Sequence, residues 1–388
     1  MSLMDHLSPI AHSVPESGIV EVVNHGRSRE GLIALWVGEG DQPTPAFISD
    51  AASASLTRGE TFYTWQRGIP NLRQELASYH SRHFGASFDA NEFYVTVSGM
   101  QAIRIGLEAI VPAGSEVLYL SPAWPNFPAA VTISGSQPVP VLLEFTERGW
   151  SLDLGRLEAS ITPRTKAIFV NSPSNPTGWT ASADDLRQIL DLARRHGLWI
   201  MADEIYSRFY YAGGRAPSFF DIREEGDRIL FVNSFSKNWA MTGWRMGWIT
   251  APPEMGQVLE NLIQYATSGV PHFLQQGAAA ALEHGDGFVD EQVERARQAR
   301  DLFCDALLAT NRVRLVKPDG AFYAFFAIDG IADPRRAALD IVDSTAVGLA
   351  PGTAFGAGGS PFFRACFLRR LDHVTQAADR LQAFIADR

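Results

Sequence analysis

Residues 229–245, which read ILFVNSFSKNWAMTGWR, join a strand-like apolar run to a polar segment that contains Lys237. The chain has only three lysines, Lys166, Lys237 and Lys317, beside 30 arginines, since the two types together number 33. An arginine stays protonated, whereas a lysine amine can lose its proton and attack a carbonyl carbon. We therefore predict that Lys237 performs chemistry that arginine cannot, and we interpret Lys166 and Lys317 as structural or surface residues.

Short β-rich runs alternate with helical stretches around this segment. The runs expected to form strands are residues 93–97, 116–120, 166–170, 198–202, 229–233 and 246–249. Apolar residues recur at helical spacing in residues 103–111 and in residues 186–193, and Gly197 ends the second helix. Alternation of this kind predicts an α/β fold with a mostly parallel central sheet and helices on both faces.

Polar side chains follow four of the predicted strands. Ser98, Asn171, Asp203 and Ser234 each come directly after an apolar run. Ligands of such sheets bind at the carboxyl ends of the strands. We therefore expect these four residues to share one site.

The chain is long enough for two packed units, because its 388 residues exceed what one hydrophobic core usually fills. Beyond residue 285, a charged helix (290–308), a hairpin-like stretch (312–328) and a C-terminal helix indicate a smaller α+β domain. We assign residues 46–285 to a large domain and residues 286–388 to the small one. Residues 1–45 form a segment that joins the small domain.

The composition limits the partners of the protein. A formal charge of −10 argues against nucleic acid and against an anionic membrane. Cys304 and Cys366 are the two cysteines, so neither a disulfide framework nor a cysteine-based metal site is expected. No apolar run is long enough to span a bilayer, and no targeting segment is recognisable, so we expect a cytoplasmic protein.

Several motifs occur together in a fixed order. They are VGEGD (37–41), NSPSNPTG (171–178), ADEIY (202–206), SFSKNWAMTGWR (234–245), GTAFG (352–356) and Phe363-Arg364. In this combination the chain resembles the pyridoxal-phosphate-dependent aminotransferases of class I/II and fold type I, the family that includes aspartate aminotransferase. The resemblance covers nearly the whole chain. It implies pyridoxal 5'-phosphate as cofactor and a fold type I structure, with a mostly parallel sheet and a smaller α+β domain.

The resemblance also implies a role for each matching residue around the cofactor ring. Lys237 matches the lysine that binds the cofactor aldehyde and then moves the substrate proton. Asp203 matches the acid that keeps the pyridine nitrogen protonated, so that the ring can accept negative charge. Asn175 and Tyr206 match the pair that hydrogen-bonds the phenolic oxygen. Trp124 matches the aromatic residue that stacks on the ring.

Other matching residues surround the cofactor phosphate. A helix that begins after Ser98 would direct backbone N–H groups at the anion. The phosphate-side positions are Ser98, Gly99, Met100, Ser234, Ser236 and Arg245. Tyr63 resembles the tyrosine that reaches the phosphate of the neighbouring subunit, which implies a homodimer.

The substrate side is defined by fewer residues. Arg364 matches the arginine that clamps the substrate α-carboxylate, and a planar guanidinium suits two carboxylate oxygens. Gly38 and Asn175 are expected near the same carboxylate. Met100 departs from the family, because relatives carry a hydroxyl or a lysine there and some use that lysine to pair with an acidic side chain. We therefore expect neutral, apolar or aromatic donors, with Trp36, Trp65 and Phe322 as candidate aromatic walls.

The predicted function is transfer of an amino group from an L-amino acid to a 2-oxo acid by a ping-pong mechanism. The alternative is a C–S β-lyase, or a related pyridoxal-phosphate enzyme, on the same fold. Tyr206 favours transfer, because lyase relatives often carry histidine after Asp-Glu-Ile. The acidic balance argues against a DNA-binding regulator built on this fold. A Rossmann dehydrogenase is disfavoured, because no Gly-x-Gly-x-x-Gly follows an early strand.

Overall fold

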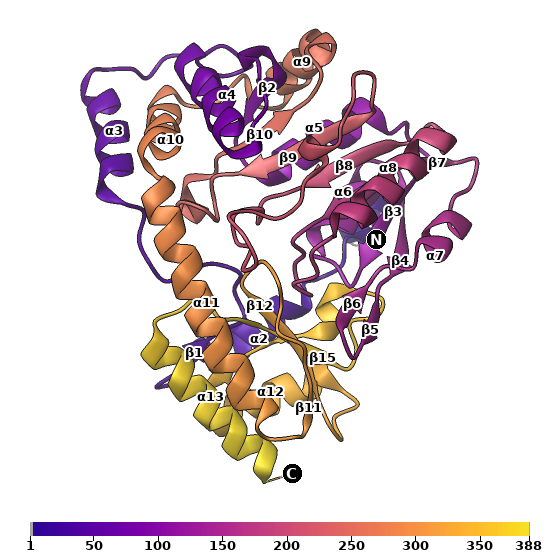
Figure 1. Cartoon of the computed structure of the whole chain (residues 1–388), viewed down its shortest axis with the longest axis vertical. Coiled ribbons are helices and arrows are strands. Elements are labelled where there is room, and N and C mark those ends of the chain that lie inside the picture. The colour runs from indigo at the N-terminus through magenta and orange to yellow at the C-terminus, as the bar shows by residue number, and fades with distance from the viewer. Residues whose placement is uncertain (1–2, 388) are drawn as a thin grey trace.

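The computed structural model describes residues 3–387, and its larger unit is built on a seven-stranded sheet (Figure 1). In spatial order the strands are β2 (Phe93–Thr96), β10 (Gly247–Thr250), β9 (Ile229–Ser234), β8 (Trp199–Asp203), β7 (Thr165–Asn171), β3 (Glu116–Ser121) and β4 (Gln137–Leu142). Strand β10 runs antiparallel to both of its neighbours, and the strands from β9 to β4 run parallel. The sheet is therefore mostly parallel, as predicted.

Six strands of this sheet occur within one residue of the predicted bounds. The seventh, β4, was not predicted. It contains Pro138 and Pro140, which lack the N–H that a central strand needs. Strand β4 lies at the edge of the sheet, and the edge position is where a strand tolerates proline.

Helices cover both faces of the sheet (Figure 1). Within β7, Ala167 and Phe169 pack in a core with α5 (Gly99–Ile110), α6 (Asn126–Ile133) and α9 (Gly256–Thr267). Ile168 and Val170 point the other way, into a core with α4 (Pro70–Phe84), α8 (Ala183–His196) and α10 (His272–His284). Helix α3 (Ala46–Thr57) packs on α10, and α7 (Leu154–Ala159) lies beside α8. Apolar residues on both sides of one strand thus produce the two cores.

Local sequence signals fix the ends of α8. The Ser182 hydroxyl accepts the N–H of Asp185 at 3.1 Å, and the Asp185 carboxylate accepts the N–H of Ser182 at 2.9 Å. This reciprocal pair satisfies two N–H groups that the first helical turn leaves unpaired. Gly197 ends the helix with a φ of 63°, a conformation that glycine adopts without a steric penalty.

The smaller unit contains a four-stranded sheet. Its order is β11 (Val313–Arg314), β12 (Tyr323–Ile328), β15 (Phe362–Cys366) and β14 (Ala350–Pro351). Three helices belong to it: α11 (Asp286–Leu308), α12 (Pro334–Thr345) and α13 (Leu371–Ala386). The expected hairpin is the antiparallel pair β11–β12, and the charged helix begins at Asp286, earlier than predicted.

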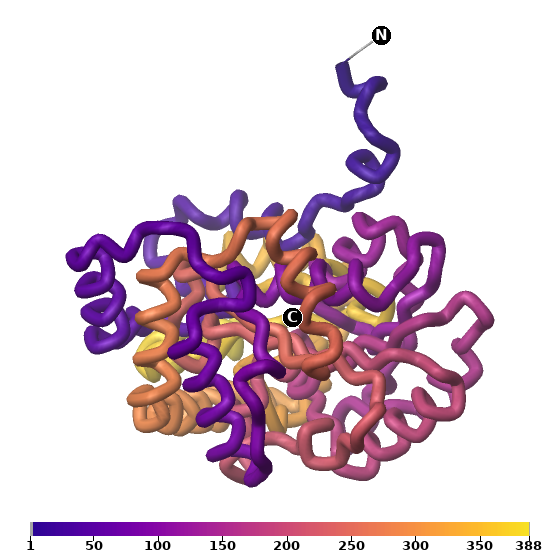
Figure 2. Tube along the Cα trace, turned by 90° about the horizontal axis from the view of Figure 1, so that it is seen from above, coloured from indigo at the N-terminus to yellow at the C-terminus, as the bar shows by residue number. Residues whose placement is uncertain are grey.

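The N-terminal segment packs against this smaller unit. Helix α2 (Gly18–Gly26) contacts α12, and β1 (Ile33–Ala34) pairs in parallel with β13 (Val347–Gly348). Val22, Ile33 and Leu35 are buried in the core of the smaller unit. Ahead of α2, η1 (Leu3–His6) and α1 (Pro9–Ser13) contain no buried residue. The segment extends outward in Figure 2, and α1 contacts α6.

The remaining elements are short. They are the hairpin β5 (Glu144–Thr146) and β6 (Gly149–Ser151) and the 3₁₀ turns η2 (Ala90–Glu92), η3 (Phe219–Asp221), η4 (Thr242–Trp244), η5 (Pro253–Met255) and η6 (Gly352–Phe355). Within residues 3–387, every helix is too short or too polar to cross a membrane.

Candidate active site

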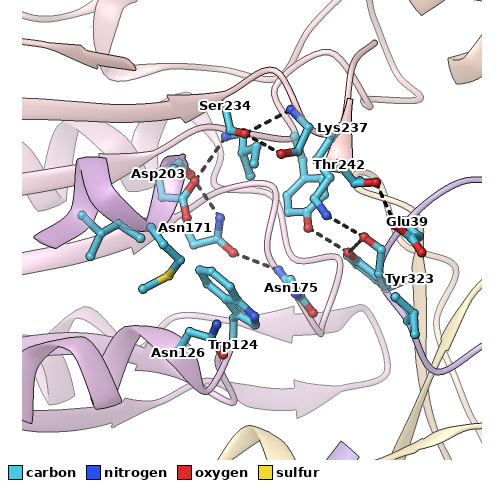
Figure 3. A pocket seen from close by; sticks show the side chains of 18 of the residues that line it. Glu39, Trp124, Asn126, Asn171, Asn175, Asp203, Ser234, Lys237, Thr242 and Tyr323 are labelled. Atoms are coloured by element: carbon cyan, nitrogen blue, oxygen red, sulfur yellow. Dashed lines mark hydrogen bonds between the residues drawn. The ribbon is translucent and has the colours of Figure 1, made fainter. Parts of the chain in front are cut away.

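A cavity of about 370 Å³ lies where the two sheets face each other. The large sheet contributes Asn171, Asp203 and Ser234, from the carboxyl ends of β7, β8 and β9. The small sheet contributes Tyr323 from β12 and Arg364 from β15 (Figure 3 labels the first of these). The expectation that polar residues at the ends of several strands share one site is met for these three strands.

Twelve of the residues to which the family resemblance assigns a cofactor or substrate role line this cavity. They are Gly38, Gly99, Met100, Trp124, Asn175, Asp203, Tyr206, Ser234, Ser236, Lys237, Arg245 and Arg364. They come from segments that lie far apart in the sequence, between residue 38 and residue 364. The sequence gives the order of these motifs along the chain, and the fold brings them together in one site.

Lys237 follows β9 and reaches the N-terminal segment. Its Nζ donates to the Gly38 carbonyl oxygen at 2.6 Å. Burial disfavours the ammonium form and lowers the pKa of Lys237 to about 8. The side chain thus exchanges its proton close to neutral pH, which an arginine at this position could not do.

Asp203 ends β8, and its side chain is buried beside the cavity. One carboxylate oxygen accepts the N–H of Ile205 at 3.3 Å, and within residues 3–387 no basic side chain forms an ion pair with it. Burial raises the pKa of Asp203 to about 7, while the Ile205 N–H and Lys237 act in the opposite direction. The Asp203 carboxylate can therefore pair with a cationic N–H group of a ligand in the cavity.

The N-terminus of α5 faces the same space. The Ser98 hydroxyl caps the helix by accepting the N–H of Gln101 at 3.0 Å. The first N–H groups of a helix have no partner inside it, so those of Gly99 and Met100 are available to an anion. Gly247 on β10 permits this placement, because a Cβ there would lie 2.7 Å from the Gly99 nitrogen.

Hydroxyl groups and a guanidinium complete this anion-binding end. The Ser234 and Ser236 hydroxyls are 2.8 Å apart, and Ser234 also donates to the Met246 carbonyl oxygen at 3.0 Å. Arg245 lines the cavity and donates to the Thr242 carbonyl oxygen at 2.7 Å. Its remaining N–H groups and the helix N-terminus suit a phosphate.

Arg364 also lines the cavity and is 2 % exposed. It donates to the Asn175 side-chain oxygen at 3.1 Å and to the Trp36 carbonyl oxygen. Its Nε is buried and has no hydrogen-bond partner within the described residues. A buried guanidinium with an unpaired N–H suits a carboxylate from a ligand.

Trp124 and Asn126 enter the cavity from the start of α6 (Figure 3). Tyr206 also lines the cavity, and its hydroxyl is 2.7 Å from that of Tyr323. Burial raises the pKa of Tyr206 well above its ordinary value, so the phenol stays protonated.

Two predicted site residues do not line the cavity. Ser98 is buried behind it as the cap of α5. Tyr63 is 92 % exposed on the surface of the chain. Among the candidate aromatic walls, Trp36 lines the cavity, whereas Trp65 stacks with Arg73 and Phe322 packs edge-on against Tyr206.

Several cavity residues were not predicted. Thr242 lies inside the quoted motif, and its hydroxyl donates to the Glu39 carboxylate at 2.8 Å. Glu39 is in the motif VGEGD. Both residues thus lie in motifs that the sequence analysis quoted, but neither was given a role there. Ile19 and Tyr323 also line the cavity. Successive side chains of the strand that contains Tyr323 point to opposite faces of the sheet, and the sequence does not show which face borders the cavity.

Comparisons with known proteins agree with this geometry. The family model described as aminotransferase class I and II matches residues 31–381. Aromatic-amino-acid aminotransferase 2 of Thermococcus litoralis is 32 % identical over 100 % of this chain and 99 % of its own. The aspartate/prephenate aminotransferase of Thermus thermophilus is 36 % identical over 84 % of this chain and 85 % of its own.

A solved structure, titled alanine aminotransferase from Pyrococcus furiosus, superposes with a TM-score of 0.92 at 27 % identity. It covers 99 % of this chain and 100 % of its own. The fold of this chain is thus one that solved aminotransferase structures share.

Proposed function

The chain belongs to the class I and II aminotransferases, and from this premise we propose that it transfers the amino group of a neutral, apolar or aromatic L-amino acid to a 2-oxo acid. The reaction proceeds in two half-reactions, in the ping-pong manner. The relatives named above are aminotransferases, which disfavours the C–S β-lyase alternative. The cofactor of this enzyme family is pyridoxal 5'-phosphate.

The residues of the cavity fit this cofactor. The unpaired acid Asp203 suits a protonated pyridine nitrogen, and the N-terminus of α5 with Ser234, Ser236 and Arg245 suits the phosphate. When bound, the cofactor supplies an aldehyde that takes up the amino group and a ring that accepts electrons from the substrate Cα. Asn175 and Tyr206 would hold the phenolic oxygen, and Trp124 would stack on the ring.

Lys237 is the residue that attaches the cofactor and then moves the proton. Its Nζ takes the proton from the substrate Cα and later delivers it. A pKa of about 8 leaves a large fraction of the amine neutral at a slightly alkaline pH. The Gly38 carbonyl oxygen, 2.6 Å away, orients the amine.

Arg364 binds the α-carboxylate of the substrate. Its buried Nε lacks a partner, and its contacts with Asn175 and Trp36 hold the guanidinium in one plane. Backbone groups around Gly38 are expected to approach the same carboxylate. Position 38 needs glycine, because a Cβ there would lie 2.4 Å from the Tyr323 hydroxyl oxygen.

The residues that line the cavity support the proposed class of amino-acid donor. Its cations within the described residues are Lys237, Arg245 and Arg364, and each already has a role. Residues 3–387 contribute no further lysine or arginine to the lining that could pair with an acidic substrate side chain. The apolar side chains of the cavity lining include Ile19, Trp36, Met100, Ile103 and Trp124. A second carboxylate would lose its hydration there without gaining a partner.

A panel of amino acids tests this proposal. Purified enzyme with bound cofactor is mixed with one amino acid at a time, without an acceptor, and the cofactor absorbance is followed. Phenylalanine, tyrosine, leucine or methionine should react at least about tenfold faster than aspartate or glutamate, in keeping with an unpaired buried charge. Aspartate as the fastest donor would contradict the donor class, and pyruvate release without transfer would support the lyase.

The proposal includes a homodimer, in which Tyr63 reaches the phosphate of the partner subunit. Tyr63 and its neighbour Phe62 are 92 % and 84 % exposed, and Tyr265 is 90 % exposed. Large aromatic side chains at such exposure suit an interface. We also propose domain boundaries after residues 45 and 285 and a cytoplasmic location, which the two free, buried cysteines suit.

A further inference from the structure

Residues 240–245 form a turn with a strained backbone. Ala240 and Arg245 have positive φ angles of 52° and 54°, a conformation in which the Cβ of a non-glycine residue crowds the following carbonyl oxygen. Residues in such conformations persist where the surrounding structure holds them. The contacts of this turn therefore decide where the Arg245 side chain lies.

Lys237 and Arg245 are anchored in different ways. Phe235 and Trp239, on either side of Lys237, are fully buried in the core of the larger unit. The turn reaches the surface at Gly243 and Arg245, which are both exposed. Packing thus fixes Lys237, whereas the position of Arg245 depends more on the hydrogen bonds of the turn.

Side chains join this turn to the N-terminal segment by hydrogen bonds. The Thr242 hydroxyl donates to the Glu39 carboxylate at 2.8 Å (Figure 3). The direction of this bond is fixed, because an ionised carboxylate can only accept. The Thr44 hydroxyl donates to the Ala240 carbonyl oxygen at 2.6 Å and accepts the indole N–H of Trp244 at 3.0 Å. The N-terminal segment thus holds the turn at several points.

The backbone of Glu39 is held by the smaller unit. Its carbonyl oxygen accepts hydrogen bonds from the Arg369 guanidinium and from the Cys366 thiol, the latter at 3.4 Å. Cys366 is the last residue of β15, two positions after Arg364. The Glu39 side chain therefore reaches the turn from a backbone that the substrate-side sheet holds, and a change of that side chain leaves these contacts in place.

Glu39 is a charged residue of the cavity lining to which the proposed function gives no task. Within residues 3–387, the other charged residues of the lining are Asp203, Lys237, Arg245 and Arg364. Each of these has a role toward the cofactor or the substrate. Glu39 instead contacts Thr242, whose carbonyl oxygen accepts from the Arg245 guanidinium at 2.7 Å. Thr242 therefore connects the Glu39 carboxylate to the arginine assigned to the phosphate.

We propose that Glu39 is a positioning residue of this active site, whose carboxylate holds the strained turn through Thr242 and so keeps Arg245 at the proposed phosphate site. The inference rests on the proposed function, because it acts through the arginine assigned to the cofactor phosphate. The role belongs to the hydrogen bond and not to the charge. A side chain that keeps an acceptor oxygen at position 39 should therefore preserve it.

Two pairs of substitutions isolate the hydrogen bond. Glu39→Ala removes the acceptor, whereas Glu39→Gln removes the charge and keeps an acceptor oxygen. Thr242→Val removes the donor, whereas Thr242→Ser keeps it. Because the two partners share one bond, Glu39→Ala and Thr242→Val should have similar effects, and the double variant should be no more impaired than either.

Thr162→Val is the matched control. The Thr162 hydroxyl donates to the Glu116 carboxylate at 2.6 Å, and neither residue lines the cavity. The control therefore loses a hydrogen bond of the same kind, threonine to glutamate, elsewhere in the larger unit.

The measurement compares two ligands of the cofactor-free protein. They are pyridoxal 5'-phosphate and pyridoxal, which has the same ring and aldehyde but no phosphate, and absorbance follows both titrations. The ratio of the two dissociation constants gives the preference of each protein for the phosphorylated form. A change that acts through Arg245 should weaken the phosphorylated ligand alone, since Lys237 and Asp203, proposed for the aldehyde and the ring nitrogen, lie outside the turn.

Glu39→Ala and Thr242→Val should lower this preference by about tenfold, the factor expected for one hydrogen bond to a charged group. Glu39→Gln, Thr242→Ser and Thr162→Val should keep the preference of the wild type. A wild-type preference in Glu39→Ala would overturn the role, and so would an equal loss of affinity for both ligands. A loss in Glu39→Gln as large as in Glu39→Ala would also overturn it, because the charge would then be responsible. If Glu39→Ala does not fold, the two Thr242 variants decide.

Failure of this role is distinguishable from failure of the proposed function. The titrations use no donor and no acceptor, so they test Glu39 even where the wild-type enzyme rejects every amino acid in the panel. A wild-type protein without a preference for the phosphorylated form would refute the proposed phosphate site, and this role with it. A wild-type preference that Glu39→Ala retains refutes the role of Glu39 alone.

Discussion

At the scale of single residues, burial gives Lys237 and Asp203 their chemical properties. Both side chains border the cavity, and burial moves both pKa values toward neutrality, to about 8 and about 7. The same physical cause thus acts on a base and on an acid with opposite signs. The amine becomes able to release its proton, and the carboxyl group is ready for a cationic partner.

Lys237→Arg should keep a positive charge in the cavity but lose the proton carrier. The rate of the half-reaction with a good donor should fall by about 10²- to 10⁴-fold or more, as for loss of a general base. Absorbance of the bound cofactor after mixing with donor measures it. Lys317→Arg is the control, since Lys317 pairs with Asp305 at 2.8 Å on the surface. A Lys237→Arg enzyme as fast as the control would refute the assignment.

Asp203→Asn should stabilise the cofactor-free protein above neutral pH. Because the folded pKa is raised from 3.8 to about 7, the contribution of Asp203 to stability is full below pH 4. It is lost as the pH rises through 7. The free energy of unfolding of Asp203→Asn should therefore exceed that of the wild type by about 2 to 4 kcal/mol above pH 7.

Urea unfolding of the cofactor-free proteins at several pH values checks this difference. Glu204→Gln is a matched comparison, because burial also raises the pKa of Glu204 to about 7. Its carboxylate faces Ser218 and Phe219 instead of the cavity, so it should gain stability without weakening cofactor binding. An Asp203→Asn protein that is no more stable than the wild type at pH 8 would contradict the assigned burial cost.

At the scale of elements, the close approach of α5 to β10 positions the proposed phosphate site. Gly247→Ala places a Cβ 2.7 Å from the Gly99 nitrogen and must displace the start of α5. The affinity for pyridoxal phosphate should fall by about tenfold or more, since the helix N–H groups move away from the anion. Titration of the cofactor-free protein, followed by absorbance, measures it.

Gly287→Ala is the control for this substitution. Gly287 lies within α11, and a Cβ there meets nothing within 4 Å. Alanine should leave cofactor affinity unchanged and raise stability by up to about 1 kcal/mol through helix propensity. If Gly247→Ala bound the cofactor as tightly as Gly287→Ala does, the close packing would not position the phosphate site.

At the scale of the whole molecule, the proposed homodimer requires that the exposed Tyr63 of one subunit completes the active site of the other. If Tyr63 serves the partner subunit, Tyr63→Ala and Lys237→Ala should each be largely inactive. Mixed dimers of the two should contain one site with both native residues. A 1:1 mixture that exchanges subunits should regain about a quarter of the wild-type activity, because about half the dimers are mixed and each has one intact site.

Activity assays after mixing, with size-exclusion chromatography, measure this recovery. Mixing either variant with itself is the control and should recover nothing. No recovery from a mixture shown to contain mixed dimers would place Tyr63 outside the partner's site.

Some features of this molecule follow from short stretches of the chain. Short apolar runs predict six of the seven strands of the large sheet, because strands buried on both faces are apolar at nearly every position. The scarcity of lysine and the neighbours of Lys237 indicate its chemistry, and Ser98, Asn171, Asp203 and Ser234 are marked by their place after strands.

Only the tertiary structure decides which distant groups meet. It places β10 antiparallel between β2 and β9, it seats the proline-containing β4 at an edge, and it brings Tyr323 against Tyr206. It also selects the Gly38 carbonyl, 199 positions from Lys237, as the acceptor of the lysine proton. The spacing of residues within one element is set by its backbone period, whereas contacts between elements depend on how both pack. Most residues proposed for the cofactor site are therefore recognisable in the sequence, whereas the contact between Tyr206 and Tyr323 is not.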